Sequence, residues 1–244
     1  MAAILELKQV TFFAQKRNIV RDFSWEYEEG KATALVGPSG CGKSTILKLS
    51  AGLLLPTQGE VCFRGKSVTA MNRKENGEFR REAAMVFQDS ALWANQSLYQ
   101  ILELPLRIHF PAMTKPEREE RIEGVCAEVG FRKELSIRPA LLSMGEQKLI
   151  GFARAMLCRP RLLYLDEWTE SLDDGSARRL IGIVKRRQAA GDTIIFVSHN
   201  LRIIRDIADI ILMILGGRLF LRLTREEIAG DEDLMRYVEM GIAS

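Results

Sequence analysis

The sequence predicts an α/β fold organised around a parallel sheet. Residues 34–36, 162–165 and 193–197 are continuous apolar runs, the pattern of strands that are buried on both faces. Helical stretches at 43–52 and 143–156 lie between them, as crossover connections do in such sheets. With 47% hydrophobic residues, the 244-residue chain can bury the core of one large or two modest domains.

A glycine-rich loop follows the first apolar run. It consists of Gly37, Pro38, Ser39, Gly40, Cys41, Gly42, Lys43, Ser44 and Thr45. Glycines at this spacing bring backbone N–H groups against phosphate oxygens, and the following helix directs its positive end toward them. Lys43 would reach the β- and γ-phosphates, and the hydroxyl of Ser44 would ligate Mg²⁺. The loop therefore predicts a nucleoside triphosphate site.

The chain before this loop predicts a small antiparallel sheet. Strand-like pieces lie at 4–7, 22–27 and 32–36. Phe12 and Phe13 are adjacent within it, and an aromatic ring here, for which we select Phe13, could stack on adenine. The alternative is ordinary strand packing, with one ring in the core and its neighbour exposed.

Polar side chains stand where the predicted strands end. Gln88 ends the run at 83–88, Asp166 and Glu167 end the second apolar run, and His199 follows the third. Open α/β sheets bind ligands at the carboxyl ends of their strands. Buried carboxylates at such an end are costly unless they contact a metal or take part in chemistry. Gln88 or His199 alone would mean little, but all these residues share one predicted edge.

Residues 89–160 have a helical pattern. Thr114 and Glu117 predict the start of one helix, and Ser143 and Glu146 form the capping box of another. His109 has no partner in the sequence pattern, and we interpret it as structural.

Composition narrows the possible function classes. A net charge of +3 is too small to favour nucleic acid binding, and the four cysteines lack metal-site spacing, which indicates reduced thiols. No apolar stretch approaches the roughly 18 to 20 residues that cross a bilayer, and the N-terminus has no secretory signal pattern. We expect a cytoplasmic protein.

Taken together, the motifs resemble the nucleotide-binding cassette of ABC transporters along nearly the whole chain. They are GPSGCGKST, the strand-end Gln88, LSMGE at 142–146, LLYLDE at 162–167, SLD at 171–173 and VSH at 197–199. The phosphate loop alone would not separate the chain from kinases or GTPases, whereas the signature at 142–146 and the histidine do.

This resemblance implies a domain organisation. It predicts a P-loop NTPase (RecA-like) core of residues 1–88 and 160–222, with an antiparallel β subdomain. An α-helical subdomain is inserted at about 89–159. The cassette would thus span residues 1–222, and residues 223–244 would form a short C-terminal tail.

The resemblance also implies roles at the site, with ATP and Mg²⁺ as cofactors. Ser44, Gln88 and Asp166 would hold Mg²⁺. Glu167 would be the general base for the attacking water, His199 would contact the γ-phosphate, and Gln88 would assist at the metal or that water.

Cassettes of this family pair head to tail around two ATP molecules. Ser143 and Gly145 of one cassette would complete the site of the other, with Asp173 at the same interface. We expect an ATPase coupled to transmembrane transport, a homodimer more than a heterodimer, and no nucleic acid partner. Membrane contact would pass through a transmembrane permease at the cytoplasmic face of the inner membrane.

Several positions depart from the family pattern. Met144 replaces a glycine of the signature, Glu146 replaces its glutamine, and Leu149 stands where an arginine is expected. Trp168 replaces a proline, and the sequence offers no account of it. The carboxylate of Glu146 would weaken closure on a triphosphate unless it turns back into the helix cap, so we expect a slow or partner-dependent ATPase.

The transported substrate is less clearly indicated. Residues 91–107 resemble cassettes of bacterial lipid-trafficking and lipoprotein-release systems, which favours a lipid or other hydrophobic substrate. Leu92, Trp93 and Tyr99 are candidates to line the groove for the permease, and core packing is the alternative for them. Two other functions stay open, a soluble ABC-type mechanical-switch ATPase and a catalytically weak regulatory cassette.

Overall fold

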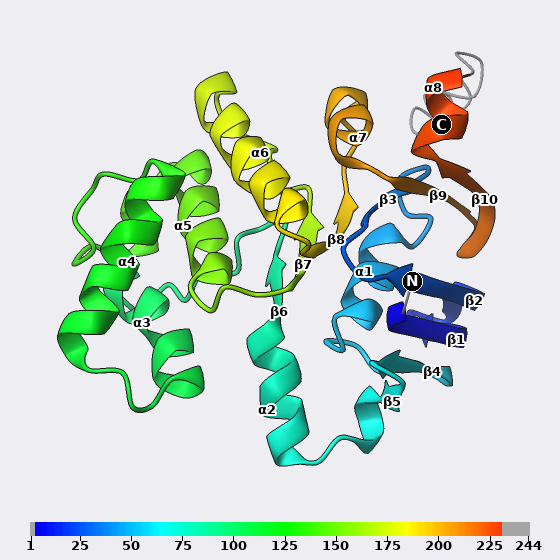
Figure 1. Ribbon diagram of the computed structural model, residues 1–244, viewed down its shortest axis with the longest axis horizontal. Helices are drawn as coiled ribbons and strands as arrows, with labels where there is room; N and C mark the ends of the chain where they lie inside the picture. The colour runs from blue at the N-terminus through cyan, green and yellow to red at the C-terminus, as the bar shows by residue number, and fades with distance from the viewer. Residues whose placement is uncertain (1–2, 231–244) are drawn as a thin grey trace.

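A computed structural model describes residues 3–230 of the chain. Its larger sheet has six strands (Figure 1). In spatial order these are β10 (Arg218–Thr224), β9 (Ile210–Leu215), β3 (Ala32–Val36), β8 (Thr193–Val197), β7 (Leu162–Asp166) and β6 (Ala83–Val86). All neighbours pair in parallel except β9 and β10. The α/β architecture and the parallel sheet predicted from the apolar runs are therefore present.

A second, four-stranded sheet contains the N-terminal part of the chain. Its order is β2 (Arg17–Glu28), β1 (Ala3–Ala14), β4 (Gln58–Phe63) and β5 (Lys66–Ser67). All its pairings are antiparallel, as expected. The strand β3, which the sequence placed at the end of this region, belongs instead to the larger sheet.

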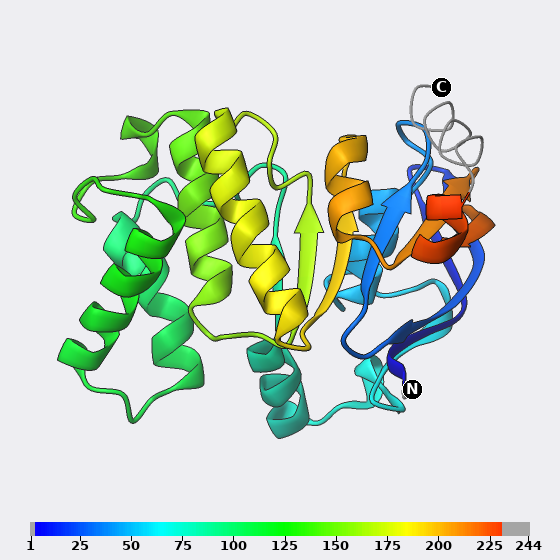
Figure 2. The ribbon, with the colours of Figure 1, turned by 45° about the horizontal axis from the view of Figure 1, so that its top comes forward.

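The larger sheet is covered on both faces because alternate side chains of its strands point in opposite directions. Leu163, Leu165 and Phe196 pack in one core with α5 (Met144–Met156), α6 (Asp174–Ala189) and α7 (Leu201–Ile207). Tyr164 and Ile195 pack in the other core with the antiparallel sheet and α1 (Lys43–Ser50). Figure 2 shows α5 and α6 side by side over the first face.

Two further helices, α3 (Leu98–His109) and α4 (Lys115–Val129), lie between β6 and β7 in the chain, together with the 3₁₀ turn η2 (Pro139–Leu141). A second 3₁₀ turn, η1 (Val68–Ala70), precedes β6. The helices α3, α4 and α5 pack on one another and share their apolar side chains with the sheet core. The subdomain boundaries at 88 and 160 stay a prediction.

Neither α2 (Arg73–Glu82) nor α7 was predicted from the sequence. The helix α2 begins with a capping box of Asn72 and Glu75 that could have revealed it. At the other end of the chain, the predicted boundary at 222 falls inside β10, and α8 (Arg225–Gly230) follows. The rest of the predicted tail, 231–244, lies outside the described residues.

The strand directions place the site. Because β3, β8, β7 and β6 are consecutive and parallel, their carboxyl ends meet at one edge of the sheet. The register pairs Val197 with both Leu35 and Asp166, so the phosphate loop, the acidic pair and His199 leave the sheet at nearly the same level.

Candidate active site

The phosphate loop depends on its glycines. Gly37 has a φ of 143°, and a Cβ on it would lie 2.2 Å from the carbonyl oxygen of Ile214. Gly42 has a φ of 108° and is the N-cap of α1. No side chain of the described residues caps this helix, so its first N–H groups are available to an anion. The loop thus leaves the N-terminus of α1 open to an anion, and phosphate binding there stays a prediction.

Lys43 is folded into the same loop. Its side chain is buried, and Nζ donates to the carbonyl oxygens of Gly37 at 2.6 Å and Pro38 at 2.8 Å. These backbone acceptors hold the ammonium beside the N-terminus of α1, where the β- and γ-phosphates of a nucleotide would be bound.

Ser44 and Asp166 meet beside the loop. Oγ of Ser44 donates to Oδ1 of Asp166 at 2.9 Å. Burial raises the pKa of Asp166, and the hydrogen bond from Ser44 acts against that rise. Residues 3–230 contain no cluster of three or more acidic, histidine or cysteine side chains that could by itself hold a metal. A hydroxyl and one carboxylate nevertheless fit Mg²⁺, which keeps several waters and takes further oxygens from phosphates.

Glu167 lies one residue beyond this pair, in a buried position. Burial, and secondly the negative charge of Glu170, raise its pKa to about 7. Its Oε1 lies 3.3 Å from Nε2 of His199, whose pKa is lowered by burial and by Lys43. A carboxylate with this pKa can exchange a proton near neutral pH, as a general base must.

Gln88 follows β6 and reaches the same edge of the sheet. Its Nε2 donates to Oε2 of Glu170 at 3.2 Å. The structure therefore places Gln88 beside the acidic cluster, although its side chain is directed to Glu170 rather than to Ser44 or Asp166.

The signature residues lie in a separate groove. Ser143, Gly145 and Asp173 line a groove of about 790 Å³ that contains no residue of the phosphate loop. Gly145 comes close to the next segment, since a Cβ on it would lie 3.0 Å from the carbonyl oxygen of Ser171. Asp173 caps α6, accepting from the backbone N–H groups of Gly175 and Ser176 at 2.9 Å each.

The unusual signature residues keep the helix start intact. Met144 is the first residue of α5 and is exposed, while Leu149 is buried. The carboxylate of Glu146 turns back into the cap, where Oε2 accepts from the N–H of Ser143 at 2.9 Å. Nζ of Lys133 pairs with the same carboxylate at 2.8 Å. The sequence predicted that Glu146 would weaken closure on a triphosphate unless its carboxylate turned back into the helix cap, and the structure has it in the cap.

The two N-terminal phenylalanines divide as adjacent strand residues do. Phe12 packs against the core, and Phe13 is 53% exposed near the end of β1. The N–H of Phe13 donates to Oγ1 of Thr57 at 3.0 Å. The strand packing that the sequence offered as the alternative is thus present, and stacking of the exposed Phe13 ring on adenine stays a prediction.

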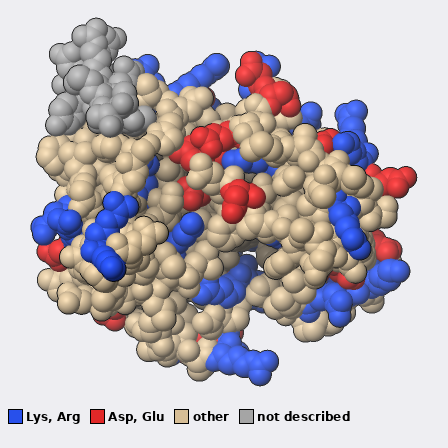
Figure 3. All heavy atoms as spheres, turned by 180° about the vertical axis from the view of Figure 1, so that it is seen from behind, with Lys and Arg blue, Asp and Glu red and all other residues tan. Residues whose placement is uncertain are grey.

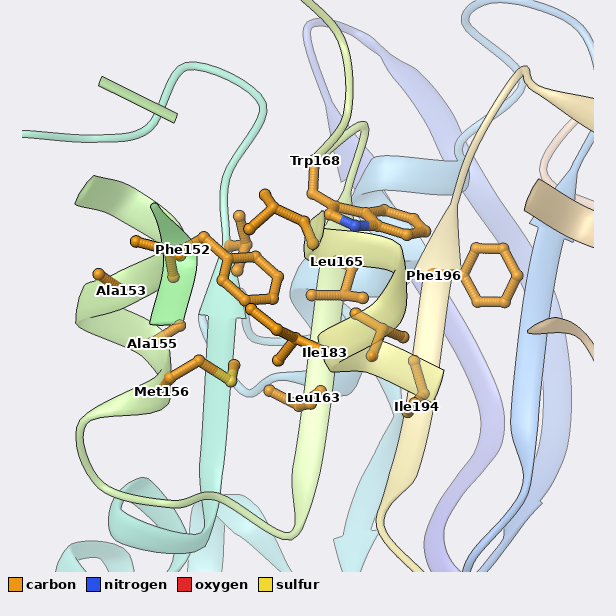
Figure 4. Close-up of a cluster of buried hydrophobic side chains, with 14 of the residues drawn as sticks. Phe152, Ala153, Ala155, Met156, Leu163, Leu165, Trp168, Ile183, Ile194 and Phe196 are labelled. Atoms are coloured by element: carbon orange, nitrogen blue, oxygen red, sulfur yellow. The ribbon is translucent and has the colours of Figure 1, made fainter. Parts of the chain in front are cut away.

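Trp168, which the sequence left unexplained, is a core residue. It is fully buried and meets the ring of Phe196 edge-on, with ring centroids 5.5 Å apart. Figure 4 shows it above Leu165 in the cluster between the sheet and its covering helices. It thereby anchors the segment that follows Glu167.

An apolar groove of about 470 Å³ lies beside β6, α3 and α5. Trp93, Leu53 and Ile108 line it and are exposed, and Arg80 and Arg154 add positive charge. Figure 3 shows this face, with a hollow that basic side chains border. His109 also lines the groove, whereas Leu92 and Tyr99 pack against the core. Of Leu92, Trp93 and Tyr99, only Trp93 lines this groove, and its contact with a permease stays a prediction.

The sequence comparison decides the family. A family model described as ABC transporter matches residues 20–170. This chain belongs to the ABC transporter family. ABC cassettes are ATP-binding subunits that hydrolyse ATP, and this chain is therefore an ATPase.

Curated relatives from several transport systems are similar to this ABC cassette. The nickel import ATP-binding protein NikE of Brucella suis biovar 1 is 37% identical over 227 residues, covering 91% of this chain and 83% of the relative. The intermembrane phospholipid transport system ATP-binding protein MlaF of Haemophilus influenzae is 32% identical over 232 residues, covering 95% and 88%.

Solved structures confirm the predicted P-loop NTPase fold of the cassette. A dimeric ATP-binding cassette in a post-hydrolysis state with ADP and Pi has a TM-score of 0.83 at 25% identity, covering 91% of this chain and 98% of that one. An ATP-binding subunit of another ABC transporter has a TM-score of 0.84 at 23% identity, covering 99% and 100%.

Three residues beside the ABC motifs were not singled out from the sequence. They are Lys133, which pairs with Glu146, Glu170, which accepts from Gln88, and Lys148, whose Nζ donates to the carbonyl oxygen of Glu167. Glu170 lies between Glu167 and Asp173 in the sequence, and this position between two motif residues could have indicated that it belongs to the site. Neither lysine stands in a motif that distinguishes it from a solvated surface residue.

Proposed function

We propose that this chain is the ATP-hydrolysing subunit of a membrane transporter, in which two copies close head to tail on two ATP molecules and drive a separate permease. The observation that carries the proposal is the division of the site. Ser143, Gly145 and Asp173 lie in a groove without any phosphate-loop residue, so one chain does not place them on its own nucleotide. The dimeric cassette to which the chain is similar supports completion by a second copy.

In each half-site the chain's own residues bind the triphosphate. Lys43 exchanges its backbone acceptors for β- and γ-phosphate oxygens, and the N–H groups at the start of α1 bind the same phosphates. Ser44 and Asp166 hold Mg²⁺, with Gln88 directed to the metal or the water after it leaves Glu170. Bound Mg²⁺ supplies positive charge that offsets the charge on the transferring phosphoryl group.

Hydrolysis then needs one proton acceptor. Glu167 takes a proton from the attacking water as the water oxygen bonds to the γ-phosphorus and the bond to the leaving ADP oxygen breaks. Its raised pKa, about 7, makes it a stronger base than an ordinary carboxylate. His199, held beside Glu167, donates a hydrogen bond to a γ-phosphate oxygen.

The signature helix of the partner copy closes each site. Ser143 and the first N–H groups of α5 face the γ-phosphate across the interface. Because Lys133 neutralises Glu146, each copy can present its own signature to a triphosphate, which supports a homodimer.

The groove lined by Trp93 and Ile108 is the proposed contact with the permease. Its apolar lining suits a short amphipathic segment of the permease, and Arg80 and Arg154 suit an acidic residue on it. No helix among residues 3–230 is long and apolar enough to span a bilayer. In this proposal the cassette lies on the cytoplasmic face of the inner membrane through that contact.

For the substrate we propose a lipid or another hydrophobic molecule. The similarity of residues 91–107 to lipid-trafficking cassettes supports this, as does the phospholipid transport relative. Import of a small polar solute is the second candidate, favoured by the higher identity to the nickel import protein.

The first experiment tests the catalytic half of the proposal with Glu167→Gln. This variant should bind ATP, hydrolyse it about a hundredfold more slowly and accumulate as a dimer in size-exclusion chromatography with ATP. Glu128→Gln, at a surface ion pair with Arg186, is the matched control and should behave like the wild type. Unchanged turnover of Glu167→Gln would remove Glu167 as the base.

The second experiment tests the transporter half. The tagged chain is purified from detergent-solubilised membranes of its native host, and its companions are identified by mass spectrometry. A multi-spanning protein, lost when Trp93 is changed to Glu, is expected. Recovery from the soluble fraction, alone or with a cytoplasmic partner, would replace the transporter with a mechanical-switch ATPase. A lipid-binding or a solute-binding companion would distinguish the two substrate candidates.

A further inference from the structure

Lys148 is a buried cation with no part in the mechanism above. It lies in the second turn of α5 and is 4% exposed. Lysine is rarely buried to this extent unless its charge is compensated. Its Nζ donates to the backbone carbonyl oxygen of Glu167 at 2.5 Å. The side chain thus links the signature helix to the residue proposed as the base.

The charge of Lys148 is balanced by the acidic cluster of the site. Burial lowers the pKa of Lys148, whereas the carboxylates of Glu170, Glu167, Asp166 and Asp89 act to raise it. The ammonium therefore lies in the electrostatic field of the carboxylates that would bind the metal and accept the proton. A neutral side chain here would leave those negative charges without this cation.

The backbone of Glu167 needs such support. Its φ of 44° lies in the left-handed region, which is strained for a residue with a side chain. The N–H of Glu167 donates to the carbonyl oxygen of Val197 at 3.2 Å, which ties it to β8. On its other side, the carbonyl oxygen accepts from Lys148 and from the N–H of Glu170 at 3.2 Å.

Lys148 is the only side chain among the described contacts that bonds to the backbone N–H or C=O of Glu167. The other two bonds are backbone bonds, which any residue type except proline can donate at positions 167 and 170. A strained conformation persists only where its surroundings hold it in place. The ammonium of Lys148 is therefore one of the groups that hold the strained backbone from which the Glu167 carboxylate projects.

We propose that Lys148 is a positioning residue for catalysis, whose ammonium fixes the Glu167 peptide so that the carboxylate faces the attacking water. This inference rests on the proposed role of Glu167 as the base. Lys148 does not reach the nucleotide in this role, and its loss should affect turnover rather than ATP binding.

The test is a double-mutant cycle in the full chain with Lys148→Met, which keeps the shape of the side chain without its charge. In the wild-type background this change should lower kcat about tenfold or more and leave KM and the affinity for a fluorescent ATP analogue within about twofold. In the Glu167→Gln background, the same change should alter the single-turnover rate by less than about twofold, because the base is already absent.

Two further variants separate positioning from folding. Phe152→Leu loosens the same helix in the core and should lower the melting temperature without lowering kcat. Lys148→Gln keeps a neutral donor and should retain more turnover than Lys148→Met. It also provides the measurement if the methionine variant does not fold.

The outcomes distinguish this inference from the proposal beneath it. If Glu167→Gln keeps normal turnover, the base itself is wrongly assigned. If Glu167→Gln is inactive while Lys148→Met keeps wild-type kcat, the positioning role is wrong. An equal loss of rate in both backgrounds, or a loss of ATP affinity that accounts for the lower rate, would also overturn it.

Discussion

Nζ of Lys133 lies 2.8 Å from Oε1 and 2.9 Å from Oε2 of Glu146. The hydrogen bond from Lys133 is the largest of the causes that lower the pKa of Glu146. The carboxylate is therefore ionised and paired at the start of the signature helix. Lys133, which stands 13 positions earlier in the chain, thereby neutralises the negative charge that Glu146 brings to the altered signature.

Lys133→Ala should weaken ATP-driven dimerisation about threefold to tenfold, because the Glu146 carboxylate in the helix cap then carries a negative charge near the partner's γ-phosphate that no cation neutralises. The dimer fraction is measured by analytical ultracentrifugation over a range of ATP concentrations. Adding Glu146→Gln should restore it. An equal effect of Lys133→Ala with and without Glu146→Gln would show that the ion pair does not govern closure.

Glu167 should make stability depend on pH. The pKa of Glu167 is about 7 in the folded chain, whereas the ordinary value of 4.5 applies to the unfolded chain. Between these two pH values the folded chain therefore binds more protons than the unfolded chain. The contribution of Glu167 to stability is thus present below about pH 4.5 and is lost as the pH rises through about 7.

Glu167→Gln, which stays neutral, should therefore gain stability over the wild type as the pH rises, by about 1 to 3 kcal/mol near pH 8. Urea unfolding without nucleotide, near pH 5 and near pH 8, gives the two differences. Identical differences at both pH values would contradict the raised pKa.

Ser44→Ala should raise the Mg²⁺ concentration needed for half-maximal ATP hydrolysis about tenfold, because the hydroxyl beside Asp166 is a proposed ligand. Ser44→Thr keeps a hydroxyl at this place and serves as the matched control. Binding of a fluorescent ATP analogue, titrated with Mg²⁺ and with a chelator, provides a readout independent of turnover. A normal Mg²⁺ requirement in Ser44→Ala would remove Ser44 from the metal site.

Phe13→Leu should raise KM for ATP about fivefold or more and leave kcat unchanged, because base–aromatic stacking contributes about 1 to 3 kcal/mol. Phe13→Tyr, which keeps the ring, should bind ATP normally. If leucine and tyrosine behave alike, the exposed ring of Phe13 does not contact adenine, and another residue performs that role.

Trp168→Ala should destabilise the fold by about 3 to 5 kcal/mol, as truncations of large buried aromatic residues do. Trp168→Phe keeps a ring against Phe196 and should lose less. Urea denaturation measures both. A loss below about 1 kcal/mol in the alanine variant would mean that the core closes over the vacated volume.

The predictable part of the site lies where local sequence and strand direction act together. Gly37 and Asp166 follow apolar runs directly, and His199 follows its run after one serine. Parallel strands bring their carboxyl ends to one edge, so the proximity of these residues could be inferred without coordinates. The helix start at Ser143 could be inferred for the same reason, since a capping box is a local pattern.

The contacts of Lys133, Lys148 and Glu170 could not be inferred in this way. Each depends on a long side chain reaching an element from a different part of the chain, as Gln88 reaches Glu170 across 82 positions. Charged residues of this kind read as solvated surface until packing shows otherwise. The role of Trp168 could not be predicted for a related reason, because its main ring contact, Phe196, lies on a strand 28 positions later in the chain.

The two carbonyl oxygens that accept from Lys43 fix its ammonium before any ligand arrives. Nζ donates to Gly37 at 2.6 Å and to Pro38 at 2.8 Å, so the long side chain is already folded against the N-terminus of α1. A phosphate would therefore meet a cation that has already lost most of its rotamer freedom, and little further side-chain entropy would be lost on binding. The loop in this sense is preorganised by its own backbone.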